Sequence, residues 1–502
     1  MTGRPAVNPK KLRPYDQPPR RRRSLIPSKP DSAATGFLVA AAMWLALAGG
    51  LGALAIGLRI VPFELDYPLP VFNLSLGVDA TRVDYAFVNA TVFGWLSNAA
   101  FAALCFMTPR LTGRRLAMEP LLVLGLLSWN MSLLGGIGSL FILDIRPHAP
   151  LTAMFWLFDG GLALGALIAT AAFVLTAGSS LVRGYVSSWF AGVALLGLMG
   201  LLGLDALVGL LDVFLDIPEL AIALGSAYVN QALMSMWLLG MTLAILHYVV
   251  PRAVGLPLAS GGLAILTFLT WLALAPLTGL RALTDPAVPY AVTTIGAVAT
   301  MLLLVPAALT VANLVMTMQG RWMLLFSAGT ASLALVSLAF LLATSLLAAI
   351  GALRSVDAYV GGTDWELGLL MWTAYGSFTF AAFAIADHAL PRMLHRSWGG
   401  NAISGAQLWL AFGGAAIAGL ALLGGGLAEG SLMGSGGAAD AMNAELLPYR
   451  VAAFLGFGLV ALAGLAHLVN LFLLYTTAEP EEYVVPGGAA PGGAAPAAAG
   501  GH

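Results

Sequence analysis

The chain has 502 residues, of which 59% are hydrophobic and only 9% are charged. Because an ordinary soluble domain has about 25% charged residues, this composition excludes a soluble enzyme, and we expect no nucleic acid partner. The formal net charge of -1 hides a basic N-terminal segment, since nine of the 23 lysines and arginines lie in the first 29 residues. The composition predicts an integral membrane protein with the lipid bilayer as its main environment.

Two low-complexity segments flank the apolar part of the chain. Residues 1–35 are rich in Pro, Arg and Ser, and we expect a basic, disordered cytoplasmic tail that sets the topology or lies against anionic lipid headgroups. Residues 477–502 are mostly Pro, Gly and Ala and have too few large apolar residues for a core. A single membrane domain, residues 36–476, is expected between them. Its lone cysteine, Cys105, excludes an internal disulfide and a cysteine-built metal site.

Twelve apolar segments are long enough to cross a hydrocarbon layer of about 30 Å as helices. They are predicted at residues 36–58, 83–107, 117–143, 151–177, 187–215, 221–250, 261–280, 289–317, 323–351, 365–391, 402–428 and 449–475. With the N-terminus in the cytoplasm, the inside segments carry 17 lysines and arginines and the outside segments carry 6. Cytoplasmic loops are enriched in these residues. The fold class is therefore an all-α, multi-pass membrane protein with both termini in the cytoplasm.

The outer loop between the first two spans, residues 59–81, is unusually apolar. It includes the sequence Tyr-Pro-Leu-Pro-Val-Phe at residues 67–72. Aromatic side chains of this kind gather at membrane interfaces. We expect the loop to pack on the membrane surface or on a partner, or to act as an interfacial anchor.

Residues 363–392 carry the most specific motif. This segment begins with Thr-Asp-Trp and ends with Leu-Pro-Arg, and it resembles the tenth helix of catalytic subunit I of the cbb-type (C-family) haem–copper cytochrome c oxidases. The sixth span, which ends at Arg252, and the second, which ends at Arg110, are similar to their counterparts in that family. The resemblance extends over most of residues 80–475. It implies the twelve-helix subunit I fold, the cell inner membrane, companion subunits of a respiratory complex, and haem and copper as cofactors.

Members of that family bind two haems and a copper ion through six histidines, because neutral imidazole suits both metals. In this chain the corresponding positions lack imidazole. They hold Phe87, Gln231, Leu277, Thr278, Leu369 and Met371. Only Met371 could ligate a haem, and weakly. The residues themselves therefore predict neither haem nor copper, in contrast to the resemblance.

Three of the six histidines lie within predicted spans. His247 and His388 precede the Pro-Arg ends of the sixth and tenth spans by about one helical turn. They either share a metal or haem or anchor the helix ends at the interface. His467, in the middle of the last span, has either a functional role or a hydrogen bond to a neighbouring helix. The other histidines are expected at the surface: His148, His395 and His502.

Buried carboxylates are costly in lipid unless they are paired or hydrated. Asp159, which precedes two glycines in the fourth span, is the main candidate for a proton-carrying or partner-pairing group, and a buried Asp that holds helices together is the alternative. Without haems, closely packed small residues or large side chains must fill the space. The large candidates are Phe87, Trp237, Met371 and Trp372.

Three functions follow. The first is a subunit I-like protein without haem or copper, which acts as a structural or regulatory subunit of a respiratory complex and has no catalytic residues. The second, which the resemblance implies, is an active cytochrome c oxidase in aerobic respiration and proton translocation, or a nitric oxide reductase relative; it needs imidazoles that converge at one depth. The third is a transporter that uses the vacated cavity, with Asp159, Gln231 or His467 as polar groups; it needs a cavity open to one side.

Overall fold

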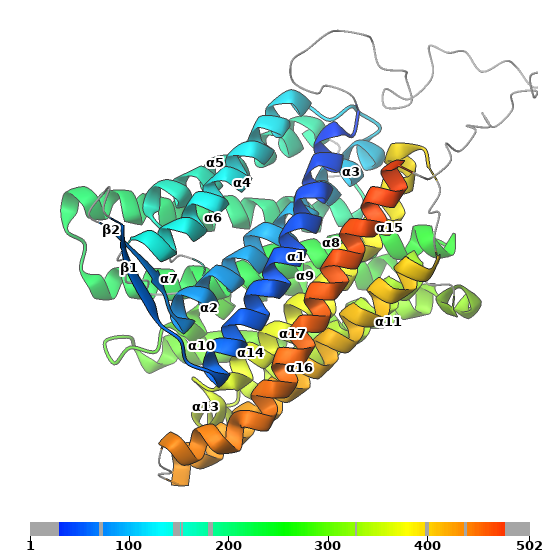
Figure 1. Ribbon diagram of the computed structural model, residues 1–502. Coiled ribbons are helices and arrows are strands. Elements are labelled where there is room, and N and C mark those ends of the chain that lie inside the picture. Colours follow the sequence, from blue (N-terminus) through cyan, green and yellow to red (C-terminus); the bar gives the residue numbers. More distant parts are fainter. Residues whose placement is uncertain are drawn as a thin grey trace, which may run out of the picture.

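The computed structural model describes residues 30–69, 74–143, 151, 154–178, 184–326, 329–396, 401–435 and 439–476. Residues 1–29 of the predicted basic tail, the whole predicted C-terminal tail, His148 and His502 lie outside these ranges. Within them, twelve helices are long and apolar enough to cross a membrane, which confirms the predicted number of spans. The helices pack side by side as one bundle (Figure 1).

Nine of the spans surround the other three. Their helices are α1 (Ser32–Ile60), α4 (Glu119–Ile142), α5 (Trp156–Ala177), α6 (Val186–Leu215), α9 (Gly261–Leu274) with the 3-10 helix η7 (Ala275–Ala282), α10 (Tyr290–Leu302) with α11 (Leu304–Thr317), α12 (Thr330–Gly351), α16 (Asn401–Ser435) and α17 (Ala439–Thr476). A short helix, α13 (Arg354–Val360), follows α12.

The three central spans are the second, sixth and tenth. The second span consists of α2 (Ala80–Asn89), η3 (Ala90–Leu96) and α3 (Ser97–Thr112). The sixth consists of α7 (Glu219–Ala232), η6 (Leu233–Leu238) and α8 (Leu239–Val254). The tenth consists of α14 (Asp364–Met371), η9 (Trp372–Phe378) and α15 (Thr379–Leu394). Their most apolar stretches are 100%, 89% and 78% buried, against at most 50% in any other span. α3, α8 and α15 also contact one another. The three spans that resemble ligand-bearing helices thus form the centre of the bundle.

These central spans share one local design. Each contains a π-helical segment followed by an α-helix of 16 residues with a proline near its end. The residue after each helix has a positive φ, at Gly113, Gly255 and His395. A π-helical segment widens the turn and shifts the side chains that follow it around the helix axis. The repeated design therefore brings equivalent positions of the three helices to a common centre.

The structure corrects three expectations from the sequence. The eighth span is interrupted at Leu303, because Pro306 has no N–H to donate to the carbonyl of residue 302. The ninth span begins at Thr330 rather than at residue 323, since residues 322–326 form a separate 3-10 helix, η8 (Trp322–Phe326). The loop between the first two spans contains an antiparallel hairpin, β1 (Leu65–Leu69) and β2 (Leu74–Val78), which the sequence did not predict, and the all-α fold class is otherwise confirmed.

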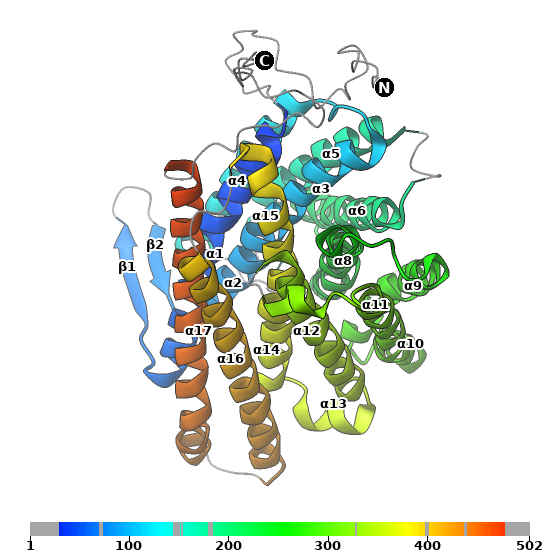
Figure 2. The same cartoon turned by 90° about the vertical axis from the view of Figure 1, so that its right-hand side faces the viewer.

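The first and last spans approach each other closely. Figure 1 shows α1, in blue, beside α17, in orange to red, and in Figure 2 α17 lies next to both α1 and α16, which it contacts. Glycine makes this approach possible: a Cβ atom on Gly49 would lie 2.7 Å from the Cα of Ala461, and one on Gly464 would lie 2.7 Å from the Cα of Ala46. In lipid, such small residues let helix backbones pack by dispersion. Close packing of small residues is thus confirmed for this helix pair.

Candidate functional site

The position that resembles the first axial haem ligand lies inside an aromatic cluster. Phe87 of α2 is 1% exposed. Its ring stacks on that of Tyr375, with centroids 6.3 Å apart, and meets the ring of Phe457 edge-on at 5.3 Å. The hydroxyl group of Tyr375 also shares a 2.7 Å hydrogen bond with that of Thr91. Three spans therefore contribute interlocking side chains to the volume next to Phe87.

The two positions that resemble the tenth-span ligands point in different directions. Met371 is fully buried in the main core. Leu369 is only half-buried and packs on the other side of the helix, against Trp365 and Leu423. Trp372 lies between α12 and α16, with its ring 5.7 Å from that of Phe340. Only Met371 therefore faces the centre of the bundle.

The positions that resemble the copper ligands also diverge. Gln231 is half-buried, and Leu277 is 38% exposed on the outside of the bundle. Thr278 is buried, and its hydroxyl group lies 2.7 Å from that of Ser235. Two residues after Ser235, the indole N–H of Trp237 donates to the hydroxyl group of Ser97 at 2.8 Å. The hydroxyl–hydroxyl bond thus links the sixth span to the seventh. The indole–hydroxyl bond links the sixth span to the second.

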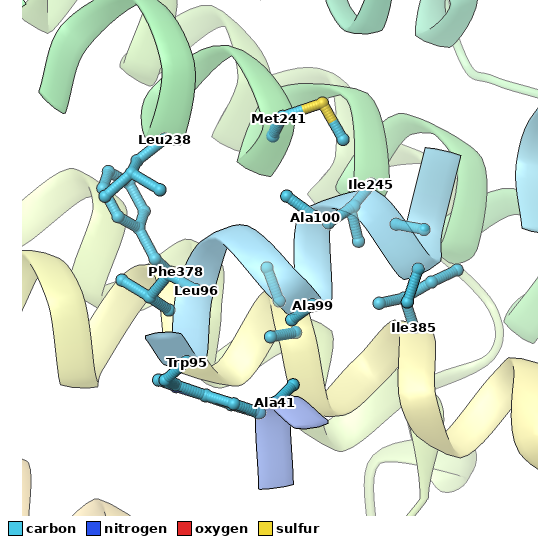
Figure 3. Close-up of a cluster of buried hydrophobic side chains, with 14 of the residues drawn as sticks. Ala41, Trp95, Leu96, Ala99, Ala100, Leu238, Met241, Ile245, Phe378 and Ile385 are labelled. Carbon is cyan, nitrogen blue, oxygen red and sulfur yellow. The ribbon is translucent and has the colours of Figure 1, made fainter. Parts of the chain in front are cut away.

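Apolar side chains fill the space between the three central helices. In Figure 3, Ala99 and Ala100 of α3 lie between Met241 and Ile245 of α8 on one side and Ile385 of α15 on the other. All five are at most 3% exposed. Trp237 is fully buried beside them, with its ring 5.3 Å from that of Phe101. Large side chains thus occupy the core: Phe87, Met371 and Trp237 are buried there, whereas Trp372, the fourth large candidate, lies between α12 and α16.

These residues do not fit a haem or a copper ion. Imidazoles ligate the haem irons and the copper in this family. The phenyl and leucine side chains at the matching positions have no ligand atom, and the other three positions offer one amide, one hydroxyl and one thioether group. The volume beside Phe87 is also filled, since even a Cβ atom on Gly52 would come within 2.4 Å of Phe457. Among the described residues, no three His, Cys, Asp or Glu side chains gather at one point.

His247 and His388 face different neighbours. His247 is fully buried and stacks on Phe190 of α6, with ring centroids 5.4 Å apart. Its Nδ1 lies 2.8 Å from the carbonyl of Leu243. Tyr185, just before α6, donates its hydroxyl group to the carbonyl of His247 at 3.1 Å, and burial raises the pKa of Tyr185 to about 12. His247 therefore ties α8 to α6 and does not converge with His388.

His388 belongs to a three-membered aromatic ring cluster at the bundle axis. Its ring lies 6.1 Å from that of Phe106 and 6.0 Å from that of Tyr248, and those two rings are 6.2 Å apart, all edge to face. Each of the three residues stands four positions before an arginine, and each arginine donates to the carbonyl of its aromatic residue. The arginines are Arg110, Arg252 and Arg392. The cluster is thus the place where equivalent turns of α3, α8 and α15 meet.

His467 of α17 lies between aromatic rings and a small cavity. The ring of Phe383 is 5.0 Å away and that of Trp95 is 6.0 Å away. Both ring nitrogens are buried without a hydrogen-bonding partner in the described part of the chain. The cavity has a volume of about 20 Å³, and its polar lining includes Asp387 and Asn470. The predicted hydrogen bond from His467 to a neighbouring helix is therefore not formed.

Asp159 lies in the first turn of α5 and is 5% exposed. Its carboxyl group interacts electrostatically with that of Asp205 on α6. Asp159 thus meets another acid and joins none of the three histidines.

The sequence did not predict an ion-pair network at the end of the bundle where α1 ends. Arg59 at the end of α1 binds Asp84 at 2.7 Å and Asp364 at 2.6 Å, and Arg450 lies 3.7 Å from the second oxygen of Asp364. The backbone N–H of Asp364 donates to Glu429 at 2.8 Å. Five helices meet here. Arg59 and Asp364 are 305 residues apart, and no local pattern relates them.

The fold and its centre define a class of protein: a multi-pass membrane subunit with the architecture of haem–copper oxidase subunit I. The chain belongs to the family described as Cytochrome C and Quinol oxidase polypeptide I, whose model matches residues 32–460. It is 24% identical, over 372 residues, to the cbb3-type cytochrome c oxidase subunit CcoN1 of Stutzerimonas stutzeri, covering 72% of this chain and 75% of that protein. The resemblance to the cbb-type subunit is thereby confirmed.

A solved structure has the same fold. A haem–copper terminal oxidase dimer determined by cryo-electron microscopy aligns with a TM-score of 0.71 at 14% identity, over 89% of this chain and 84% of that chain. At this identity the likeness concerns the fold alone. Membership of the family implies haem and copper, whereas the side chains at the matching positions do not fit them.

Proposed function

We propose that this protein holds neither haem nor copper and acts as a structural or regulatory subunit of a respiratory membrane complex. One observation carries the proposal: Phe87, Tyr375 and Phe457 interlock where an axial imidazole and a porphyrin would have to be accommodated. The protein's side chains do not supply electron-transfer chemistry by themselves. A subunit with this core retains the shape of an oxidase subunit without its redox centres.

The localisation follows from charge. The arginines that end the three central spans lie at the same end of the bundle as the start of α1, where Asp31 binds Arg110 through both oxygens at 2.8 Å. The enrichment of Lys and Arg in these segments supports a cytoplasmic position. We therefore place the protein in the cell inner membrane with both termini in the cytoplasm. Its partners are other membrane subunits of the complex.

The test is cofactor content. The full chain is purified in mild detergent from its native membrane together with associated subunits, and the subunits are then separated. A pyridine haemochrome spectrum and metal analysis are recorded for this chain, with an active cbb-type subunit I as the control. We expect a haem-to-protein ratio near zero, no copper, and co-purified respiratory subunits. Stoichiometric haem would contradict the proposal and support an active oxidase.

A transport function is the second candidate, because one polar cavity borders a buried histidine. Transporters bind substrates and coupling ions near the membrane midplane, and a cavity of about 20 Å³ is large enough only for a proton carried by water. Uptake of solute or protons by vesicles containing the protein, compared with empty vesicles, would favour this candidate. The observation that favours the structural role instead is the packed centre between α3, α8 and α15.

A further inference from the structure

His467 has an unmet need for hydrogen bonds. A neutral imidazole presents one N–H donor and one acceptor nitrogen. His467 is 3% exposed, and neither ring nitrogen has a partner in the described part of the chain. Leaving buried polar groups unmatched in this way is costly. A further hydrogen-bonding species beside the ring would remove this cost.

The cavity next to His467 has the size and the lining for water. Its volume of about 20 Å³ holds one water, which needs roughly 10–15 Å³ of such space and two to four polar partners. Besides His467, the polar lining comes from three helices. These residues are Asp387, Ser404, Gln407 and Asn470. Asn470 and Ser404 already bind each other at 3.0 Å, which orders that side of the cavity.

The cavity lies close to the arginine-bearing end of the bundle. Asp387 precedes Arg392 by five residues, and Ser404 lies in the first turn of α16. His467 precedes the end of α17 by nine residues, or about 14 Å at 1.5 Å per residue. The polar side chains thus lead inward from one face and end at the aromatic contacts of His467 with Trp95 and Phe383.

We propose that His467 is a proton-binding site that water reaches from the face where α1 begins and α17 ends. Water in the cavity passes a proton to one ring nitrogen of His467 and takes it back, with no other bond made or broken. Asp387 is the titratable neighbour in the cavity lining. It accepts a hydrogen bond from Thr330 of α12 and interacts with Arg392 on its own helix. The other polar lining groups are uncharged.

This inference stands apart from the proposed function. It needs no haem, copper or partner subunit, so a failure here leaves the cofactor question untouched, and the reverse also holds. It gives the protein a proton-exchanging group, because a hydrated histidine about 14 Å inside the bundle forms the inner end of a proton path that opens to one face only. A buried histidine that only packs helices would not exchange protons with that face.

The first experiment measures access to position 467. Cys105 is replaced by Ala to remove the lone thiol, and H467C is introduced, with H247C as the matched control because His247 is also fully buried but does not line this cavity. Silver ions, which are close to water in size, are applied to sealed vesicles whose N-terminal side is identified by a tag. We expect the thiol of H467C to be lost only from the N-terminal side, while that of H247C persists. Equal protection of both thiols, or reaction from the opposite side, overturns the proposal.

The second experiment needs no cysteine variant and so remains decisive if H467C fails to fold. Wild-type protein with ¹⁵N-labelled histidine is placed in lipid nanodiscs, and the His467 signal is assigned by its loss in H467Q. After transfer to D₂O, the hydrogen on the ring nitrogen of His467 is expected to exchange for deuterium, while the ring N–H of His247 keeps its ¹H. Equal exchange rates for the two rings would refute a hydrated path to His467.

Discussion

Phe87 of α2 and Tyr375 of η9 lie face to face, with ring centroids 6.3 Å apart and ring planes within 8° of each other. Phe87 is the position that resembles a haem-ligating histidine, and Tyr375 stands one turn after the second such position, Met371. An aromatic pair and the edge-on ring of Phe457 thus join three spans at this position. The contribution of these contacts to stability can be measured on the purified protein.

Truncation of Phe87 tests whether this aromatic cluster stabilises the bundle. F87A is expected to cost about 3–5 kcal/mol of unfolding free energy, because it leaves a cavity that the surrounding helices cannot close. The control is F472A, since Phe472 is 65% exposed on the outside of α17. Unfolding in mixed micelles measures both. Similar losses for the two variants would contradict a packed centre.

Asp364 is expected to be the most sensitive member of the ion-pair network at the end of α1. It is 6% exposed and faces Arg59 and Arg450, so D364N leaves two partly buried guanidinium groups short of a counter-charge, at a cost of about 3 kcal/mol. D357N removes a carboxylate that is 42% exposed and binds Arg281 at 2.5 Å, and should cost less than about 1 kcal/mol. The difference is read from the same unfolding measurement, and an equal effect would argue against the network.

Replacement of two adjacent glycines of α1 should have very different effects on stability. A Cβ atom on Gly49 would lie 2.7 Å from backbone atoms of Ala461, whereas one on Gly50 meets nothing within 4 Å. G49V is therefore expected to separate α1 from α17 and to cost about 1–3 kcal/mol or more, while G50V leaves packing intact. Thermal unfolding in detergent compares them, and the contact between α1 and α17 is in doubt if G50V is the more harmful change.

His388 should tolerate an aromatic replacement. The equivalent positions in the other central spans are Phe106 and Tyr248, and all three rings meet edge to face. H388F keeps that geometry and should change the unfolding free energy by less than about 1.5 kcal/mol, whereas H388A removes the ring and costs more. Loss of a bound metal in H388F, detected by metal analysis, would show that His388 is a ligand instead.

Alkaline pH should weaken the contact between α6 and α8. Burial raises the pKa of Tyr185 from 10.0 to about 12, so the folded protein holds the phenolic proton more tightly than the unfolded chain. This contribution is complete below pH 10 and is lost as the pH rises from about 10 to about 12. Y185F lacks the titrating group, and its stability should fall less over that interval. Parallel curves for wild type and Y185F would disprove this assignment.

Most of the architecture could be predicted from local sequence. Membrane spans can be predicted from the length and composition of apolar runs, since every backbone polar group in lipid must be hydrogen-bonded within its own helix. The Thr-Asp-Trp and Pro-Arg motifs placed the tenth span in register with a known family. Local patterns were less informative where tertiary contacts decide, as in the hairpin after α1 and the start of α12 at Thr330.

The candidate site was likewise predictable from the sequence only in part. The sequence alone determined which residues stand at the ligand-like positions, because the motifs set the register along each helix. Only the tertiary structure decided what those residues do: that Phe87 meets Phe457, that His388 joins Phe106 and Tyr248, and that His467 borders a polar cavity. These contacts join residues tens to hundreds of positions apart, and their geometry depends on how helices rotate and approach one another. The sequence pattern along a single helix does not specify that rotation.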